Sequence, residues 1–351
     1  MKFSDVLDIR NGRNQRQVEN ENGKYPIYGS GGVMGHATDF ICDAGTVVIG
    51  RKGSINNPIF VDEPFWNVDT AFGLVAHREV LLPKYLFYFC VNFDFERLNT
   101  TVTIPSLTKA NLLQIEINVP DMDEQRRVVS VLDKTCQLID LQQQELHNLD
   151  QLVKSRFIEL FGDPVSNSMG LPTEPMTTVC AIIDGDRGKN YPKQDEFSDT
   201  GYCLFLNAKN VTAMGFSFEN RMFITEEKDN ILHNGKLERG DVVLTTRGTL
   251  GNMAFYDDSV PFENVRINSG MVILRMKKSV MTEVFFMEQF KLQLQSIKGK
   301  IASGSAQPQL PISTMSKIRI LLAPMALQEQ FATFVEQTDK SKLCGMMEVA
   351  A

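Results

Sequence analysis

Gly45–Ile55 reads GTVVIGRKGSI, and Gly240–Leu250 reads GDVVLTTRGTL at a constant offset of 195 residues. Both stretches keep glycines at the same two positions and an apolar Val-Val pair, and Lys52 falls on Arg247. The match keeps the order of residues as well as the composition, which is the signature of an internal repeat. The fold is therefore expected to contain the same unit twice.

A second pair of blocks repeats at a larger offset of 203 residues. Pro105–Pro120 reads PSLTKANLLQIEINVP, and Pro308–Ala323 reads PQLPISTMSKIRILLA. The pairs kept at this offset are Leu107/Leu310, Ile115/Ile318, Ile117/Ile320 and Gln125/Gln328. The larger offset implies that about eight residues are inserted between the two blocks in the second copy.

Each copy combines strand-like and helix-like stretches. Short apolar runs bounded by Gly, Asn and Asp predict strands at Thr46–Ile49, Val242–Thr245 and Gly270–Leu274. Length and apolar spacing predict helices at Leu82–Phe95 and Thr282–Ile297. Each unit is thus predicted to be a mixed α/β domain.

A long helix is predicted after the first unit, because residues 123–161 contain no Gly or Pro. At 1.5 Å per residue, such a helix is roughly 58 Å long and needs a partner. Alternating steps of four and three residues place one stripe on its face: Val128, Leu132, Thr135, Ile139, Gln142, Leu146, Leu149, Val153, Arg156 and Leu160. The partner is expected to start near Leu327 and to be shorter, because Gly345 interrupts its pattern.

The predicted fold class is α/β, of the mixed α+β kind, with two tandem domains that are each followed by a long helix. The predicted boundaries are 1–120 for the first domain, 121–163 for the long helix, 164–324 for the second domain and 325–351 for the shortened helix.

Composition excludes several other classes of protein. The chain of 351 residues is 43% hydrophobic and 23% charged, as in globular proteins, and has no apolar run long enough to span a membrane and no signal-peptide layout. A cytoplasmic location is expected.

Six scattered cysteines fit neither a zinc ribbon nor a disulfide framework and are interpreted as small buried residues. Four histidines without metal-ligand spacing predict no metal site. A net charge of −7 disfavours DNA binding by bulk electrostatics, although local basic faces exist.

The sequence as a whole resembles the specificity subunit of type I restriction-modification systems. The stretches that carry the resemblance are YPIYGSGG (25–32), TVVIGRKGSI (46–55), FWNVDTAF (65–72), PDMDEQRRVVSVLDK (120–134), LFGDP (160–164) and GDVVLTTRGTLG (240–251).

This resemblance implies that each α/β unit is a target-recognition domain that reads one half of a bipartite double-stranded DNA sequence. It also implies that the two long helices pack as an antiparallel coiled coil and act as a spacer between the half-sites. It implies assembly with two modification subunits, which bring S-adenosylmethionine and methylate adenine. It also implies assembly with restriction subunits, which use ATP and Mg to cleave DNA. No cofactor is expected on this chain itself, and self-association through the shortened helix is a further expectation.

Motifs for intrinsic catalysis do not stand out from the sequence. Asn57–Phe60 (NPIF) departs from the Asn/Asp-Pro-Pro-aromatic site of an adenine methyltransferase, and Gly29–Gly32 (GSGG) does not satisfy the pattern of its Gly-rich cofactor loop. The P-loop motif is absent. We therefore expect a recognition protein without chemistry of its own. The alternative is a truncated, non-reading structural adaptor that mediates assembly through its helices, a hypothesis motivated by the short second helix.

Candidate DNA-binding residues follow the apolar strands of the first unit. Arg51, Lys52 and Ser54 lie among glycines directly after the strand at 46–49, where backbone and cations can approach a phosphate. Tyr28 and Ser30 belong to a glycine-rich stretch that is either a contact loop or only a turn. Trp66 is expected in the core rather than as a base-stacking platform.

The second unit supplies the corresponding candidates. Thr246, Arg247 and Thr249 occupy the positions of the first unit's cationic loop. The alternative interpretation is a tight turn with exposed charges, but the cation kept at Lys52 and Arg247 favours DNA. Further candidates for base or phosphate contacts lie in polar loops that also suit a solvated hairpin: Arg187, Lys189, Asn207 and Lys209.

Overall fold

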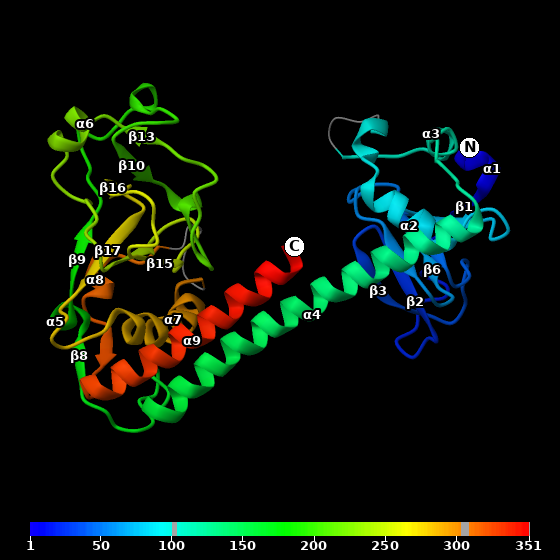
Figure 1. Cartoon of the computed structure of the whole chain (residues 1–351). Helices are drawn as coiled ribbons and strands as arrows, with labels where there is room; N and C mark the ends of the chain where they lie inside the picture. The colour runs from blue at the N-terminus through cyan, green and yellow to red at the C-terminus, as the bar shows by residue number, and fades with distance from the viewer. Residues whose placement is uncertain (100–103, 303–308, 351) are drawn as a thin grey trace. The chain divides into compact units, whose positions relative to one another are not determined.

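The computed structural model describes residues 1–99, 104–302 and 309–350. They form two compact units, Met1–Leu141 and Gln142–Ala351 (Figure 1). Helix α4 (Met122–Phe161) is continuous through the boundary and contributes one half to each unit. Each unit has its own sheets and its own core.

The first unit is built on a four-stranded sheet of order β1-β7-β4-β5 and a three-stranded sheet of order β3-β2-β6. Every residue of β4 is buried, which explains its unbroken apolar run. The strands are β1 (Leu7–Asn11), β2 (Tyr25–Gly29), β3 (Gly32–Ala37), β4 (Thr46–Gly50), β5 (Ile59–Val61), β6 (Trp66–Asn67) and β7 (Ala71–Ala76). The helices besides α4 are α1 (Phe3–Val6), α2 (Pro83–Asn92), the 3₁₀ helix η1 (Phe95–Leu98) and α3 (Lys109–Leu112).

The second unit has the corresponding four-stranded sheet, of order β15-β14-β17-β9, and a three-stranded sheet of order β13-β10-β16. Two further pairs, β11-β12 and β18-β8, complete it. Its strands are β8 (Thr173–Pro175), β9 (Cys180–Asp184), β10 (Cys203–Leu206), β11 (Val211–Thr212), β12 (Gly215–Phe216), β13 (Phe223–Ile224), β14 (Asp241–Thr245), β15 (Met253–Tyr256), β16 (Val265–Ile267), β17 (Met271–Met276) and β18 (Arg319–Leu321). Its helices are α5 (Met176–Val179), η2 (Gln194–Glu196), η3 (Ala208–Asn210), α6 (Glu226–Ile231), α7 (Glu283–Ala302), α8 (Ile312–Met315) and α9 (Met325–Ala350).

The internal repeat is present in the strand pairing. Val47 lies opposite Leu74 in the antiparallel pair β4-β7, and Val242 lies opposite Leu274 in β14-β17. A parallel pair also occurs in each unit, β2 with β6 and β10 with β16. The predicted fold class of two tandem mixed α/β units with long helices is therefore confirmed. Pro308, in the second repeat block, lies outside the described residues.

A buried glutamine at the start of each long helix attaches that helix to its own unit. The Gln125 side chain accepts a hydrogen bond from the Leu82 amide at 2.8 Å and donates to the carbonyl oxygens of Val80 and Pro120 at 2.8 and 2.9 Å. Gln125 is completely buried. Gln125 therefore holds the start of α4 inside the first unit rather than at its surface.

The second unit repeats this attachment atom for atom. Gln328 accepts from the Thr282 amide at 2.9 Å and donates to Val280 and Ala323 carbonyl oxygens at 3.1 and 2.8 Å. Gln328 is also completely buried. A pair of helices is thus joined to its units by equivalent hydrogen bonds.

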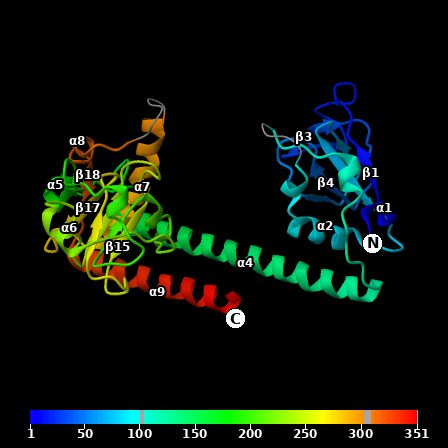
Figure 2. The same ribbon diagram turned by 90° about the horizontal axis from the view of Figure 1, so that it is seen from above.

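Within the second unit, α9 packs antiparallel against the second half of α4 (Figures 1 and 2). Four completely buried rings meet at the closed end of the pair: Phe157, Phe161, Phe285 and Phe331. Farther along, Lys342 forms an ion pair with Asp150 at 2.8 Å. This core includes part of α7 as well as the two long helices.

The predicted stripe on α4 needs two corrections. Val153 is buried, but the buried face then continues through Phe157 and Phe161, at steps of four, rather than through Arg156 and Leu160. Leu160 is only partly buried at the edge of the core, because the aromatic rings take the central positions. Of the remaining predicted positions, Val128, Leu132, Gln142, Leu146 and Leu149 are half-buried, and Thr135 and Ile139 are exposed.

Other expectations of the sequence can be compared directly. Trp66 is buried, and its Nε1 donates to the Arg13 carbonyl oxygen at 3.0 Å, which confirms a core position.

Cys42, Cys90, Cys180 and Cys203 are buried as expected. Cys136 is exposed on α4, so the expectation of burial is wrong for this cysteine. The side chain of Cys344 is outside the described part. Helix α9 continues through Gly345 and has 26 residues, against 40 in α4. No described helix has both the length and the apolar character to cross a bilayer.

Candidate nucleic-acid interface

The cationic loop after β4 is fixed by backbone hydrogen bonds. The Arg51 amide donates to the Thr70 carbonyl oxygen at 2.8 Å, and the Leu107 amide donates to the Arg51 carbonyl oxygen at 2.9 Å. Gly53 has a φ of +84°, a backbone conformation that is strained for a residue with a side chain. The turn therefore needs glycine at this position. Arg51, Lys52 and Ser54 are exposed on this fixed loop.

The loop after β14 has the same construction. The Thr246 amide donates to the Gly270 carbonyl oxygen at 2.9 Å, and the Leu310 amide donates to the Thr246 carbonyl oxygen at 3.1 Å. Gly248 has a φ of +71°. The two repeat blocks of the sequence therefore meet through the same hydrogen bond in both units. Arg247 projects from the position that Lys52 holds in the first unit.

The structure brings a second candidate loop beside each cationic loop. In the first unit, a Cβ built on Gly53 would lie 3.5 Å from the Ser30 hydroxyl oxygen. In the second unit, the Thr249 hydroxyl donates to the Ala208 carbonyl oxygen at 3.4 Å. Ala208 lies between the candidates Asn207 and Lys209. Asn207 accepts a hydrogen bond from the Lys209 amide at 2.9 Å, so its side chain caps this turn, while Lys209 is exposed.

Two predicted contact residues have roles inside the fold instead. Thr246 is buried, and its hydroxyl donates to the Gly270 carbonyl oxygen at 3.0 Å. The side chain thus attaches the loop after β14 to Gly270. Tyr28 is half-buried, with its ring edge against Phe65 at a centroid distance of 5.3 Å, and burial raises its pKa. Thr246 and Tyr28 thus make contacts within the fold, and direct contact of either side chain with DNA stays a prediction.

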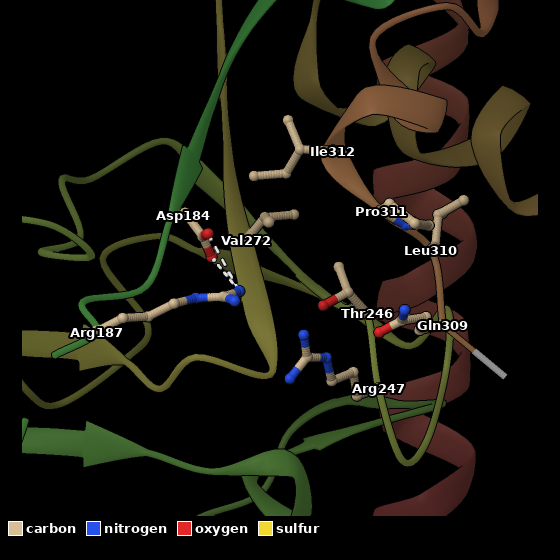
Figure 3. Close-up of a pocket in the computed structure, with 9 residues that line it drawn as sticks. All are labelled: Asp184, Arg187, Thr246, Arg247, Val272, Gln309, Leu310, Pro311 and Ile312. Carbon is tan, nitrogen blue, oxygen red and sulfur yellow. Dashed lines mark hydrogen bonds and ion pairs between the residues drawn. The ribbon is translucent and has the colours of Figure 1, made fainter. Parts of the chain in front are cut away.

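Arg187 and Arg247 come together although they lie far apart in the sequence. Both line a pocket of about 230 Å³ at the loop end of the β9-β17-β14 sheet (Figure 3). Arg187 follows β9 and forms an ion pair with Asp184 at 3.1 Å. Lys189, two residues farther, is exposed in the same loop. The loop end of the second unit thus combines cations from two separate sequence motifs.

Sequence reasoning missed Gln309, which lines this pocket and is exposed. A signal for it existed, because Gln309 immediately precedes Leu310, the residue matched to Leu107 in the repeat. Ser106, which holds the equivalent position in the first unit, forms a backbone bridge with Lys52.

Few side chains among the described residues are candidates for a catalytic role. No group of three or more His, Cys, Asp or Glu side chains there could hold a metal ion. Burial raises the pKa values of Cys42, Cys180 and Cys203 to about 12, which disfavours the nucleophilic thiolate at neutral pH. The exposed groups of both loop ends are hydrogen-bond donors, which suits binding of an anionic partner.

The family model for the type I restriction modification DNA specificity domain matches residues 1–151 and 177–343. The chain belongs to this family. The first matched stretch contains the whole first unit, and the second lies within the second unit. The duplicated loops and helices are thus the duplicated parts of a specificity subunit, which confirms the resemblance seen in the sequence.

Named relatives and solved structures agree with the family. The MjaVIII specificity subunit of a type I restriction enzyme from Methanocaldococcus jannaschii is 23% identical over 320 residues, which cover 85% of this chain and 70% of that protein. A putative type I restriction enzyme specificity subunit from Haemophilus influenzae is 20% identical over 324 residues, covering 90% of this chain and 80% of that protein.

Two solved structures have the same fold along the full chain. The S subunit of a type I restriction-modification system from M. genitalium matches with a TM-score of 0.63 and 17% identity, covering 100% of this chain and 91% of that one. A chain from a study of complex assembly and conformational transition of the type I restriction-modification system matches with a TM-score of 0.54 and 15% identity, covering 100% and 93%. Both likenesses concern the fold.

Proposed function

We propose that each unit of this specificity subunit binds one half of a bipartite double-stranded DNA target. The observation that carries the proposal is the duplicated loop end, where Lys52 and Arg247 project from loops fixed by the same backbone hydrogen bonds. A fixed loop that presents a cation at the end of a buried sheet suits a phosphate contact. Repetition of this arrangement in two separately folded units is what a two-part target requires.

The chain acts in this proposal as the recognition part of a larger complex. It positions two modification subunits, and with them restriction subunits, on the target, and it catalyses no step itself. S-adenosylmethionine, ATP and Mg belong to those partner subunits. The net charge of −7 supports this division, because an acidic chain binds DNA weakly by bulk electrostatics and gains affinity from its partners.

Assembly can be measured by size-exclusion chromatography with light scattering, on the chain alone and co-expressed with a modification subunit of the same system. The expected product is a complex of one chain with two modification subunits that binds duplex DNA more tightly than the chain alone. A chain that does not bind the modification subunit, or that forms only a homodimer, would contradict the proposal and favour a structural adaptor.

Catalysis can be assayed separately with the isolated chain, S-adenosylmethionine and duplex DNA. We expect no methyl transfer until the modification subunits are added. Robust methylation by the isolated chain would overturn the non-catalytic assignment.

A further inference from the structure

The pocket at the loop end of the second unit has an apolar wall and a polar mouth. Val272, Leu310, Pro311 and Ile312 form the wall, and Arg187, Arg247 and Gln309 supply the polar groups. Figure 3 shows the two guanidinium groups directed into the same space, with Gln309 beside Arg247. Such a mixture of fixed walls and a few converging polar groups is typical of a recognition site.

The first unit has different side chains at the equivalent positions. Phe72 faces Ile49 in the first unit as Val272 faces Leu244 in the second, so the smaller Val272 stands where the first unit has an aromatic ring. Arg51 stands in place of Thr246, and its guanidinium lies 5.7 Å from the Phe72 ring centroid. Larger side chains therefore occupy this corner of the first unit, and the two loop ends differ in shape.

Arg187 differs from Arg247 in being held in one place. Its Nη2 donates to the Asp184 carboxylate at 3.1 Å and to the Ser269 carbonyl oxygen at 3.3 Å, while the side chain stays 51% exposed. Among the described residues, the hydrogen bonds of the Arg187 guanidinium involve only Nη2. Its Nη1 and Nε therefore remain able to donate to other groups. The side chain of Arg247 forms no hydrogen bond or ion pair with any residue that the structure describes.

This arrangement separates two tasks. A cation without other side-chain partners suits a phosphate, whose position along the backbone is independent of sequence. A guanidinium paired with a carboxylate keeps its own charge, but the pair has little net charge and the donors are already oriented. This favours discrimination over bulk attraction. In the major groove, guanine presents two neighbouring acceptors, N7 and O6, to such a group of donors.

We propose that Arg187 is a specificity-determining residue that reads a guanine in the half-site bound by the second unit, and that Asp184 is its positioning residue. The inference rests on the proposed function and adds the base and the residues to it. Asn11 pairs with Phe72 in the first unit as Asp184 pairs with Val272 in the second, so Asn14 corresponds to Arg187 by counting three residues along the chain. The Asn14 Oδ1 accepts a hydrogen bond from the Arg16 amide at 3.0 Å. The two units therefore read different bases at this position.

Two variants with opposite charge changes test the inference in the complex with modification subunits. The wild-type complex first selects its target from a pool of randomised duplexes, and binding is then measured to that target and to versions with each base pair replaced. Arg187→Ala removes a cation, and Asp184→Asn removes an anion. Both should lower discrimination at one guanine of the second unit's half-site by about 5- to 150-fold, with the other half-site unchanged.

A purely electrostatic role predicts a different result, because the two variants would then shift affinity for all sequences in opposite directions. That result, or full retention of every base preference in Arg187→Ala, would overturn the inference. Asn14→Ala, the matched change in the first unit, should leave the second unit's half-site unaffected. Failure of the wild-type complex to select any bipartite sequence would instead contradict the proposed function, so the two failures are distinguishable.

Discussion

The side-chain oxygen of Gln125 lies 2.8 Å from the amide nitrogen of Leu82 and ties the start of helix α4 to the first unit. Gln328 makes the matching contact with Thr282 in the second unit. Both glutamines are fully buried, and each of them also donates to two carbonyl oxygens. The long helices are therefore attached to their units by specific polar contacts as well as by apolar packing.

Gln125→Ala should destabilise the first unit by about 1–3 kcal/mol, because it leaves the buried Leu82 amide and two carbonyl oxygens without partners. Urea denaturation measures the free energy of unfolding, and hydrogen exchange of the Leu82 amide reports the lost contact directly. Gln144→Ala, at an exposed position of α4, is the control and should change stability by less than about 0.5 kcal/mol. Unchanged protection of the Leu82 amide in Gln125→Ala would contradict the assignment.

Lys52→Ala and Arg247→Ala should each weaken DNA binding by the complex for all sequences. The loss of one phosphate contact reduces the slope of log affinity against log salt concentration by roughly one for each variant. Titrations of a fluorescent duplex at several salt concentrations give this slope. An unchanged slope, equal to that of the exposed control Lys134→Ala, would mean that these loops are structural turns.

Phe157→Ala should cost the second unit about 3–5 kcal/mol, since the ring is fully buried and contacts the rings of Phe161, Phe285 and Phe331. The same measurement on Ile139→Ala, at an exposed position of the same helix, should show a change below about 1 kcal/mol. Equal effects of the two variants would contradict the packing described for α4.

The buried ion pair of Asp229 with Arg266 makes stability depend on acid pH. Burial alone raises the pKa of Asp229, but hydrogen bonds from Lys236 and Arg266 outweigh it and hold this pKa below the ordinary value of 3.8. Because the folded-state pKa is the lower one, the stabilisation is fully present above pH 3.8 and is lost as the pH falls below it through the folded-state pKa.

Asp229→Asn should therefore cost about 3–5 kcal/mol at neutral pH, because it leaves the Arg266 charge buried without its partner. The stability difference from the wild type should shrink as the pH is lowered below 3.8. Thermal unfolding of both proteins across this range measures it, with exposed Asp258→Asn as the control. A difference that stays constant down to pH 2 would refute the linkage.

The sequence predicts the repeated parts of this fold where side chains are constrained. Gly45 and Gly53 match Gly240 and Gly248 because all four have positive φ, which restricts the residue type. Other repeated parts leave no such trace. The His77 amide donates to the Val6 carbonyl oxygen at 2.8 Å, and the Lys277 amide donates to Val179 in the same way, but backbone hydrogen bonds do not select a side chain.

The candidate interface is predictable to a similar degree. Lys52 and Arg247 stand out because they directly follow matched strands, whereas the presence of Arg187 and Gln309 in one pocket depends on tertiary contacts between distant loops. The aromatic core at Phe157 and Phe161 escapes a heptad pattern because α7 also packs there, and a third helix changes which face of α4 is buried.

Selection from a pool of randomised duplexes by the complex with modification subunits tests the central claim most directly. Sequencing of the bound DNA should give two short blocks of defined bases separated by a gap of fixed length without base preference. Substitution in the loops of one unit should alter only one block. Enrichment of no sequence, or of a single uninterrupted block that responds to substitutions in both units, would contradict a chain that reads DNA with two separate units.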